Sequence, residues 1–171
     1  WRALVALMWL ATLGGCAVVT TAPAPTLEPD ASIALVPIAN YTETPQAGQR
    51  AEAIVEGLLI AAGRQVIRYP AELRADSGFE PGDKRSADSA LAWAKKTPAK
   101  YALVGAVDEW RYKVGIDGEP AVGAAFSLVE LSSGKTLWSA TGARSGWSRE
   151  ALAAVGQKLM QRLLRDIAPA P

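Results

Sequence analysis

The stretch from Lys100 to Lys113, KYALVGAVDEWRYK, constrains the fold more than any other part of this 171-residue chain. It begins as an apolar run, which is typical of a strand buried on both faces, and it then alternates. In the alternating part Trp110 and Tyr112 share one face, whereas the charged residues beside them share the other. The stretch therefore predicts a long β-strand that starts in a core and ends half exposed.

The remainder of the C-terminal half reads as a meander followed by a helix. Turn residues at 115–120 lead to a strand at 121–131, and the tight turn Ser132–Lys135 leads to its hairpin partner at 135–144. From Ser148 onward, apolar residues recur at spacings of three, four and seven as far as Ile167. That period predicts a long amphipathic helix with Ser148 as its N-cap.

The preceding residues predict two strand–helix units. The expected elements are a strand at 32–40 that Pro37 restricts to an edge or a bulge, a helix at 48–63 ending on Gly63, a strand at 65–69, a surface loop at 71–85 and a helix at 86–97. The resulting order is β-α-β-α-β-β-β-α. It predicts an α/β (α+β) fold in which a mixed sheet is flanked by helices, as one domain over 32–168 with a short tail at 169–171.

The first sixteen residues have the pattern of a secretion signal. Arg2 precedes an apolar stretch over 3–13, which is shorter than the ~20 residues that a membrane-spanning helix needs. Leu13-Gly14-Gly15-Cys16 follows and resembles the lipobox of bacterial lipoproteins, in which the chain is cut before a cysteine that carries lipid. We therefore expect a signal peptide at 1–15 and lipidation of Cys16. The alternative is an apolar core helix that contains an ordinary buried cysteine.

After Cys16, residues 17–31 mix Pro, Ala and Thr without any period, and they predict an extended linker. The chain has 18 Lys and Arg against 17 Asp and Glu. Cleavage before Cys16 removes Arg2 alone of these, which leaves 17 of each sign. Because the sequence has neither a basic excess nor a basic stripe, we expect no nucleic-acid partner.

The chain has no histidine and one cysteine. A catalytic triad with histidine, a Cys–His pair, a zinc site of His or Cys ligands and an internal disulfide are therefore excluded. Asp108 and Glu109 are neighbours on a strand, where adjacent side chains point to opposite faces, so they cannot flank one glycosidic bond. We expect no catalytic residues, no metal and no cofactor.

Several longer stretches resemble the PelC family of lipoproteins from the Pel exopolysaccharide export apparatus. These stretches are Val36–Thr42, Arg50–Ile54, Gly105–Gly115, Gly118–Gly123 and Trp138–Glu150. The resemblance implies a domain similar to the curli-secretion and TolB amino-terminal folds. It also implies a palmitate-bearing lipoprotein on the periplasmic face of the outer membrane, involved in biofilm polysaccharide export. Its implied partners are eleven further copies in a dodecameric ring, an outer-membrane porin and a cationic exopolysaccharide.

Candidate site residues follow from the residues and from this resemblance. Trp147 has polar neighbours and precedes a helix, so it either packs on the core or contacts the membrane interface, the role that the resemblance favours. Asp117 and Glu119, together with Asp108, are candidates for an acidic opening that attracts the glycan. The alternative for Asp117 is that Asp-Gly simply suits a turn.

Two other sets have alternative interpretations. Trp110 and Tyr112 with Asp108 form either a sugar-stacking ladder or, more often for such a pattern, packing under a helix. Glu109, Arg111 and Arg144 are candidates for an interface between subunits. The leading hypothesis is a non-enzymatic export lipoprotein. The alternative is a regulatory lipoprotein that binds and activates a cell-envelope synthase or a secretion partner.

Overall fold

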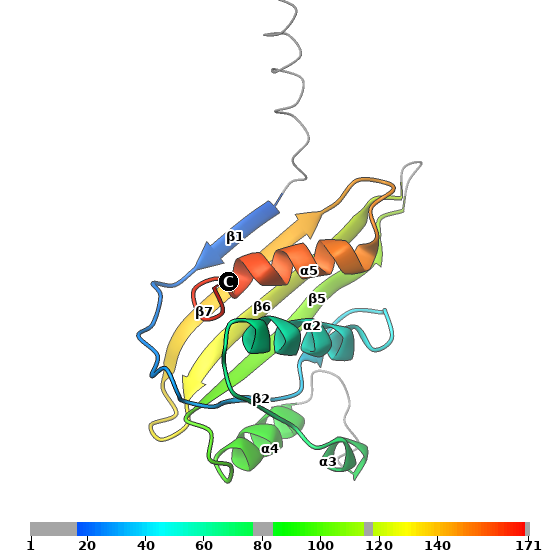
Figure 1. Cartoon of the computed structure of the whole chain (residues 1–171). Helices are drawn as coiled ribbons and strands as arrows, with labels where there is room; N and C mark the ends of the chain where they lie inside the picture. Colours follow the sequence, from blue (N-terminus) through cyan, green and yellow to red (C-terminus); the bar gives the residue numbers. More distant parts are fainter. Residues whose placement is uncertain (1–16, 77–83, 115–117, 170–171) are drawn as a thin grey trace, which may run out of the picture.

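The computed structural model describes residues 17–76, 84–114 and 118–169 (Figure 1). Its strands are β1 (Ala17–Thr21), β2 (Ile33–Leu35), β3 (Ala39–Asn40), β4 (Val66–Arg68), β5 (Tyr101–Tyr112), β6 (Pro120–Glu130) and β7 (Thr136–Ser145). Its helices are α2 (Ala47–Ala61), α3 (Ala71–Asp76), α4 (Lys84–Ala94) and α5 (Leu152–Leu163). None of the described helices is both long and apolar enough to cross a bilayer.

One mixed sheet organises these elements, in the order β1-β7-β6-β5-β2-β4, with β3 also paired to β5. The pairs β2–β4, β2–β5 and β3–β5 are parallel, whereas β5, β6, β7 and β1 form an antiparallel meander. The parallel half comes from strand–helix crossovers and the antiparallel half from short turns, as the sequence predicts. The predicted mixed α/β fold is therefore confirmed.

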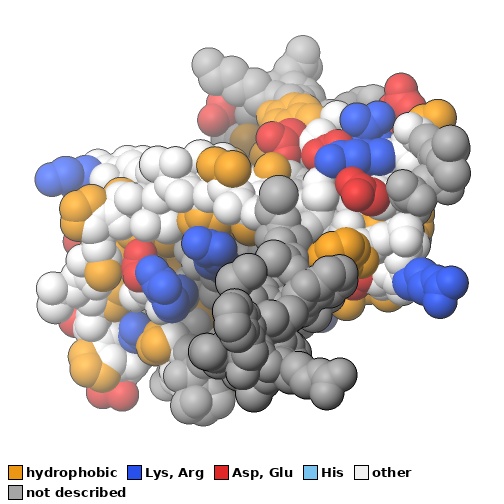
Figure 2. All heavy atoms as spheres, turned by 90° about the horizontal axis from the view of Figure 1, so that it is seen from above, with side chains coloured by type: hydrophobic (Ala, Val, Ile, Leu, Met, Phe, Trp, Pro, Cys, Tyr) orange, Lys and Arg blue, Asp and Glu red, His pale blue; other side chains and the backbone are white. Residues whose placement is uncertain are grey.

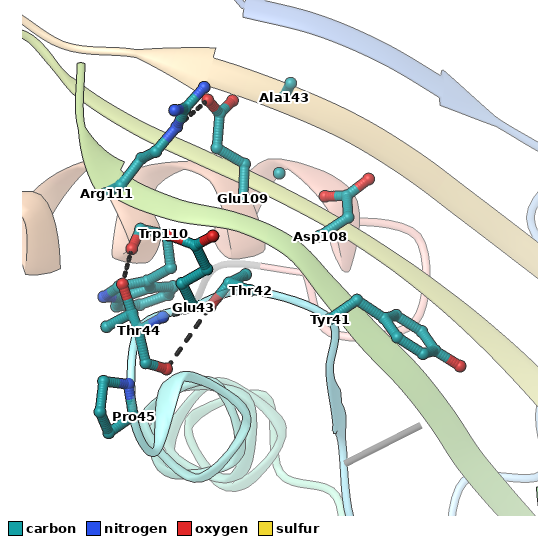
Figure 3. Close-up of a pocket in the computed structure, with 11 residues that line it drawn as sticks. Tyr41, Thr42, Glu43, Thr44, Pro45, Asp108, Glu109, Trp110, Arg111 and Ala143 are labelled. Carbon is teal, nitrogen blue, oxygen red and sulfur yellow. Dashed lines mark hydrogen bonds and ion pairs between the residues drawn. The ribbon is translucent and has the colours of Figure 1, made fainter. Parts of the chain in front are cut away.

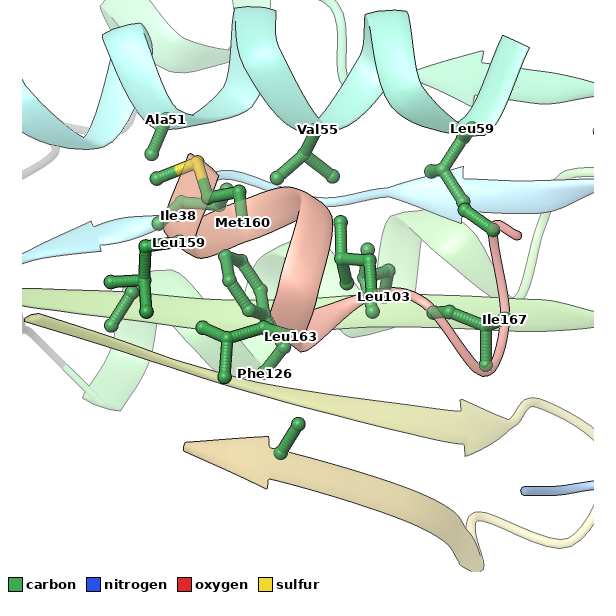
Figure 4. Close-up of a cluster of buried hydrophobic side chains, with 14 of the residues drawn as sticks. Ile38, Ala51, Val55, Leu59, Leu103, Phe126, Leu159, Met160, Leu163 and Ile167 are labelled. Atoms are coloured by element: carbon green, nitrogen blue, oxygen red, sulfur yellow. The ribbon is translucent and has the colours of Figure 1, made fainter. Parts of the chain in front are cut away.

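Helices α2 and α5 cover one face of the sheet, and α4 packs on the other face at one end (Figure 1). The larger core lies between α2, α5 and the sheet and contains fully buried Leu59, Leu103, Phe126 and Leu163 (Figure 4). A smaller cluster under α4 includes Ala90, Ala94 and Ala102. Because α4 covers only one end of its face, the meander exposes much of its second face.

The N-terminal segment differs from its prediction. Residues 17–21 do not belong to an extended linker, since they form β1 and pair in antiparallel register with the end of β7. The folded unit thus includes Ala17–Thr21 and is not limited to the residues from Ser32 onward. The predicted strand at 32–40 is divided at Pro37 into β2 and β3, because proline lacks the N–H that a continuous ladder requires.

Three other boundaries differ. The predicted loop at 71–85 contains helix α3, and α4 begins at Lys84 and ends at Ala94. Helix α5 begins at Leu152 and not beside Ser148, because Ala151 has an extended backbone (φ −68°, ψ 133°) and acts as the N-cap without a side-chain hydrogen bond. Gly63 follows the C-cap of α2 with φ +76°, which agrees with its predicted role.

A buried ion pair joins the elements around the break in the first strand. Among the described residues, Glu52 of α2 is the one charged residue that is buried. Ile38 N–H donates to its carboxylate at 2.9 Å. Arg74 of α3 donates to both oxygens of the same carboxylate, at 3.0 and 2.7 Å. Glu52 therefore satisfies a backbone donor that Pro37 leaves outside the ladder and also holds α3 in place.

Candidate functional site

A β-bulge in β5 creates the main feature of the exposed sheet face. Val107 pairs with Ala124 and Glu109 with Gly123, so Asp108 is the extra residue between them. Val107 and Trp110 both face the large core, and the two residues between them both point away from it (Figure 3). Gly123 makes room for this arrangement, because a Cβ there would overlap Asp108 Oδ1 and lie 3.3 Å from Glu109 Cβ.

A short loop after β3 forms the opposite wall. The Asn40 side chain organises it, since its oxygen accepts from Thr42 N–H (3.0 Å) and Thr42 Oγ1 (2.8 Å) while its nitrogen donates to Thr44 O (2.8 Å). Tyr41 N–H donates to Val107 O at 2.8 Å, and Thr44 Oγ1 donates to Trp110 O. These bonds fix the loop against the bulge.

The bulge and the loop together line a pocket that opens on the exposed face (Figure 3). Three carboxylates surround it, from Glu43, Asp108 and Glu109, and Arg111 supplies a positive charge. Tyr41 is 62% exposed at its edge. The arrangement presents a net negative charge beside an accessible aromatic ring, which suits a cationic sugar better than an anionic one.

The structure corrects the geometric reason for excluding glycosidase chemistry. The bulge places Asp108 and Glu109 on the same face, so alternation does not separate them. Their surroundings do not suit general-acid chemistry, however. Asp108 is exposed to water, and Glu109 is paired with Arg111 at 3.1 Å. The general-acid carboxyl of a glycosidase usually lies in an apolar pocket that excludes water, and neither Asp108 nor Glu109 has such surroundings.

The three candidate interface residues do not lie together. Glu109 and Arg111 form an ion pair within one strand on the exposed face. Arg144 pairs in register with Val122, whose side chain belongs to the large core, so Arg144 lies on the helix-covered face. Its Nε is buried without a hydrogen-bond partner in the part of the chain that the structure describes.

Trp147 lies in the corner between β7 and α5 and is 52% exposed. Its backbone N–H donates to Glu150 Oε2 at 3.4 Å, and Lys158 Nζ donates to Glu150 Oε1 at 2.7 Å. The hydrogen bond from Lys158 holds the pKa of Glu150 below its ordinary value. Burial acts to raise this pKa, whereas the Trp147 N–H and the charge of Arg144 also lower it. The ring of Trp147 thus stands at the surface on a corner that charge interactions fix.

Trp110 and Tyr112 differ from each other. Trp110 is 2% exposed and packs under α5, where Gly156 leaves space for its ring, so the packing interpretation holds for Trp110 and it is not part of a sugar-stacking ladder. Tyr112 is 51% exposed, and its hydroxyl accepts a hydrogen bond from Leu152 N–H at 3.2 Å. It therefore caps the first turn of α5.

The remaining candidates are dispersed. Glu119 is exposed at the hairpin end of β6 and does not line the pocket. Cys16 and Asp117 lie outside the described residues. Within 17–76, 84–114 and 118–169, no group of three or more His, Cys, Asp and Glu side chains has the arrangement of a metal site.

Tyr41 and Glu43 are site residues that the sequence did not indicate, because they lie in a polar loop far along the chain from Asp108. The parallel register of β3 on β5, Asn40 opposite Val107, brings them together. A sequence feature does hint at the bulge. Val107 and Trp110 are separated by two charged residues and not by one, which breaks the period of two.

Comparison with known proteins gives whole-chain matches. The PelC dodecamer from Paraburkholderia phytofirmans is 41% identical, with a TM-score of 0.75, and the match covers 91% of this chain and 99% of that one. A variant of that PelC, also a dodecamer, matches at 41% identity and a TM-score of 0.73 over 88% and 98% of the two chains.

A more distant match shares the fold. Lipoprotein GNA1162 from Neisseria meningitidis is 23% identical with a TM-score of 0.59, and the match covers 82% of this chain and 99% of that one. No protein-family model and no curated protein sequence matches the chain.

Proposed function

This chain belongs to the PelC family, and from that premise we propose that it is a lipid-anchored envelope protein that forms a ring and assists export of a cationic polysaccharide. The observation that carries the proposal is the 41% identity to dodecameric PelC over 91% of the chain. In this role the protein has no catalytic step. It positions charge and apolar surface around a path for the glycan, which leads to a porin in the outer membrane.

The proposed glycan path is lined by acidic groups, and their combined field is strong because every subunit of the ring repeats them. Asp108, Glu109 and Glu43 line one pocket, and Glu119 is exposed at the hairpin end. A single exposed carboxylate acts weakly, because salt screens it beyond about 8 Å at physiological ionic strength. A ring repeats each group once in every subunit, so the same few residues create a continuous negative field that an amine-bearing glycan follows.

Charge neutralisation tests this role. Replacing Asp117→Asn, Asp108→Asn and Glu119→Gln together should lower both polysaccharide export and the salt-sensitive binding of a partly deacetylated oligosaccharide. The matched control is Glu72→Gln, Asp88→Asn and Asp30→Asn, which removes three exposed carboxylates from α3, from α4 and from the segment before β2. Equal export by the control and the test variant, with unchanged salt dependence, would mean that the acidic residues only form turns and surface.

The proposed membrane contact is made by Trp147 beside the lipid on Cys16. An indole combines an apolar ring with one N–H donor and is favoured at the membrane interface. Because its ring is half exposed, Trp147→Ala should cost less than the ~3–5 kcal/mol of truncating a fully buried tryptophan. The same variant should reduce polysaccharide export in living cells. A loss of ~3–5 kcal/mol in the free energy of unfolding would instead assign Trp147 to the core.

A further inference from the structure

Strand β1 begins at the residue that directly follows Cys16. Ala17 pairs with Arg144, and the ladder continues to Thr21 opposite Ala140. Beyond the strand, Ala22 N–H donates to Ser139 O at 2.8 Å. One residue of chain spans at most ~3.6 Å. If Cys16 carries the lipid, the lipid is therefore attached to the edge of the folded sheet with no spacer between them.

The pairing of β1 is specific and depends on close packing at one position. Val19 packs against the large core. Gly142 lies opposite Val19, and a Cβ at position 142 would be 2.5 Å from Val18 O and 2.9 Å from Val19 Cγ2. Real Cβ atoms do not approach other atoms so closely. The close fit of β1 on β7 thus requires glycine at position 142.

The antiparallel register also determines which end of the molecule lies next to the anchor. The start of β1 lies beside the end of β7, and therefore beside the end of β5 and the start of β6. Among the described residues, the exposed apolar side chains at the ends of β5 and β7 are Tyr112 (51%), Val114 (100%) and Trp147 (52%). We call them the apolar end. Strand β1 is one strand spacing, about 4.8 Å, from β7.

Basic residues accompany the apolar end. Lys113 and Arg149 are exposed; Lys113 lies between Tyr112 and Val114, and Arg149 follows Trp147 by two residues. The exposed Glu119 lies at the same end, where its carbonyl oxygen accepts from Lys113 N–H at 2.7 Å. Lys113 Nζ donates to Ser145 Oγ at 2.7 Å, which keeps it near the end of β7. In the view from above, Lys and Arg side chains stand beside both hydrophobic and acidic ones (Figure 2). Apolar and basic groups together are typical of a surface that lies in the headgroup region of a bilayer.

We infer that β1 is a rigid coupling that holds the apolar end in the surface of the membrane. The inference rests on the proposed lipidation of Cys16 and extends it to how the domain is oriented. A flexible tether of about 15 residues has a root-mean-square length of ~21 Å. Interfacial side chains enter the bilayer by only ~5–10 Å. A tether of that length would let the apolar end leave the lipid, whereas a docked β1 keeps it there.

Tryptophan quenching in vesicles tests this coupling in the mature lipidated protein. The vesicles contain phosphatidylcholine with brominated acyl chains, which quench only tryptophans that reach them. Trp110 and Trp138 are buried, at 2% and 1% exposure, and subtracting the signal of a Trp147→Phe variant isolates Trp147. We expect clear quenching of Trp147 in the unmodified protein.

Two matched insertions then separate coupling from anchoring. A flexible segment of about ten residues (Ala first, then Gly and Ser) between Cys16 and Ala17 adds a reach of ~18 Å and should reduce Trp147 quenching at least twofold. The same segment between Pro23 and Ala24 leaves Cys16 next to β1 and should not change it. Gly142→Val, which displaces β1, should reproduce the first insertion.

Each outcome has a distinct meaning. Equal quenching for both insertions and the unmodified protein would overturn the coupling, while membrane attachment and export would remain as proposed. No Trp147 quenching in the unmodified protein would contradict the proposed membrane contact and the coupling with it. Fractionation of Cys16→Ser tests the anchor separately, because loss from the membrane is expected whether or not β1 acts as a coupling.

Discussion

Gly156 lies where helix α5 crosses the indole of Trp110. A Cβ at this position would lie 2.6 Å from Trp110 Cη2 and 3.0 Å from Cζ3. The ring is buried and cannot move away, so Gly156→Ala overpacks the core. We expect this variant to lose ~1–3 kcal/mol of unfolding free energy in a denaturant titration.

A second helical glycine provides the control. Gly57 is in α2, is exposed, and has no atom within 4 Å of a Cβ built on it. Gly57→Ala should therefore stabilise the protein by ~0.5–1 kcal/mol, because alanine lowers the entropy of the unfolded chain. Equal effects for both substitutions would mean that α5 does not pack on Trp110 as closely as described.

The contribution of Glu150 to the stability of the folded protein, at the corner beside Trp147, depends on pH. Its pKa in the folded protein lies below the ordinary value of 4.5, chiefly because Lys158 donates a hydrogen bond to it. A lowered folded pKa means that the stabilisation is complete above the unfolded pKa and is lost as the pH falls through the folded one. The difference in melting temperature between the unmodified protein and Glu150→Gln should thus be present at neutral pH and shrink below about pH 4.5. A constant difference down to about pH 3 would contradict this assignment.

At the scale of elements, the Glu52 carboxylate connects α2, the β2–β3 segment and α3. Glu52→Ala removes one partner of a buried pair and leaves Ile38 N–H and Arg74 without this acceptor. We expect a loss of ~2–4 kcal/mol in chemical unfolding. Glu56→Ala in the same helix is the matched control, because the Arg68 side chain that pairs with Glu56 is 61% exposed. Its expected loss is below about 1 kcal/mol.

The elements that the sequence predicts best are those with a strong local pattern. The β5–β7 meander agrees with its predicted ranges within a residue or two, because alternation and the turn at Gly134 are both local. Strand β1 was missed because it is five residues long and obtains its stability from pairing with β7, more than a hundred residues away. The predicted start of α5 beside Ser148 is wrong because the backbone is still extended at Ala151, and the local sequence pattern does not indicate this.

The candidate site was only partly predictable for the same reason. The charged residues Asp108, Glu109 and Arg111 were identified from the sequence, but their common face depends on a bulge that shifts the register against Gly123. Tyr41 and Glu43 reach the pocket through the parallel pairing of β3 with β5, which local sequence does not specify. The sequence therefore indicates which charged groups the site contains, whereas the shape of the pocket depends on strand pairing between distant parts of the chain.

At the scale of the whole molecule, the 18 Lys and Arg nearly balance the 17 Asp and Glu, so any electrostatic action depends on how the charged side chains are arranged. The exposed second face of the meander and the pocket at the bulge belong to one protomer. Only assembly of several copies, as in the dodecameric PelC relatives, would join such surfaces into a continuous path. The proposed function therefore depends on the number of copies in the particle.

Light scattering coupled to size-exclusion chromatography measures that number most directly. The sample is the chain from residue 16 onward with Cys16→Ser, in detergent-free buffer at micromolar concentration. We predict one sharp peak at the mass of a ring, with twelve protomers as in the PelC relatives. A peak at the mass of one protomer would contradict the ring and favour a regulatory lipoprotein that acts by binding a single partner.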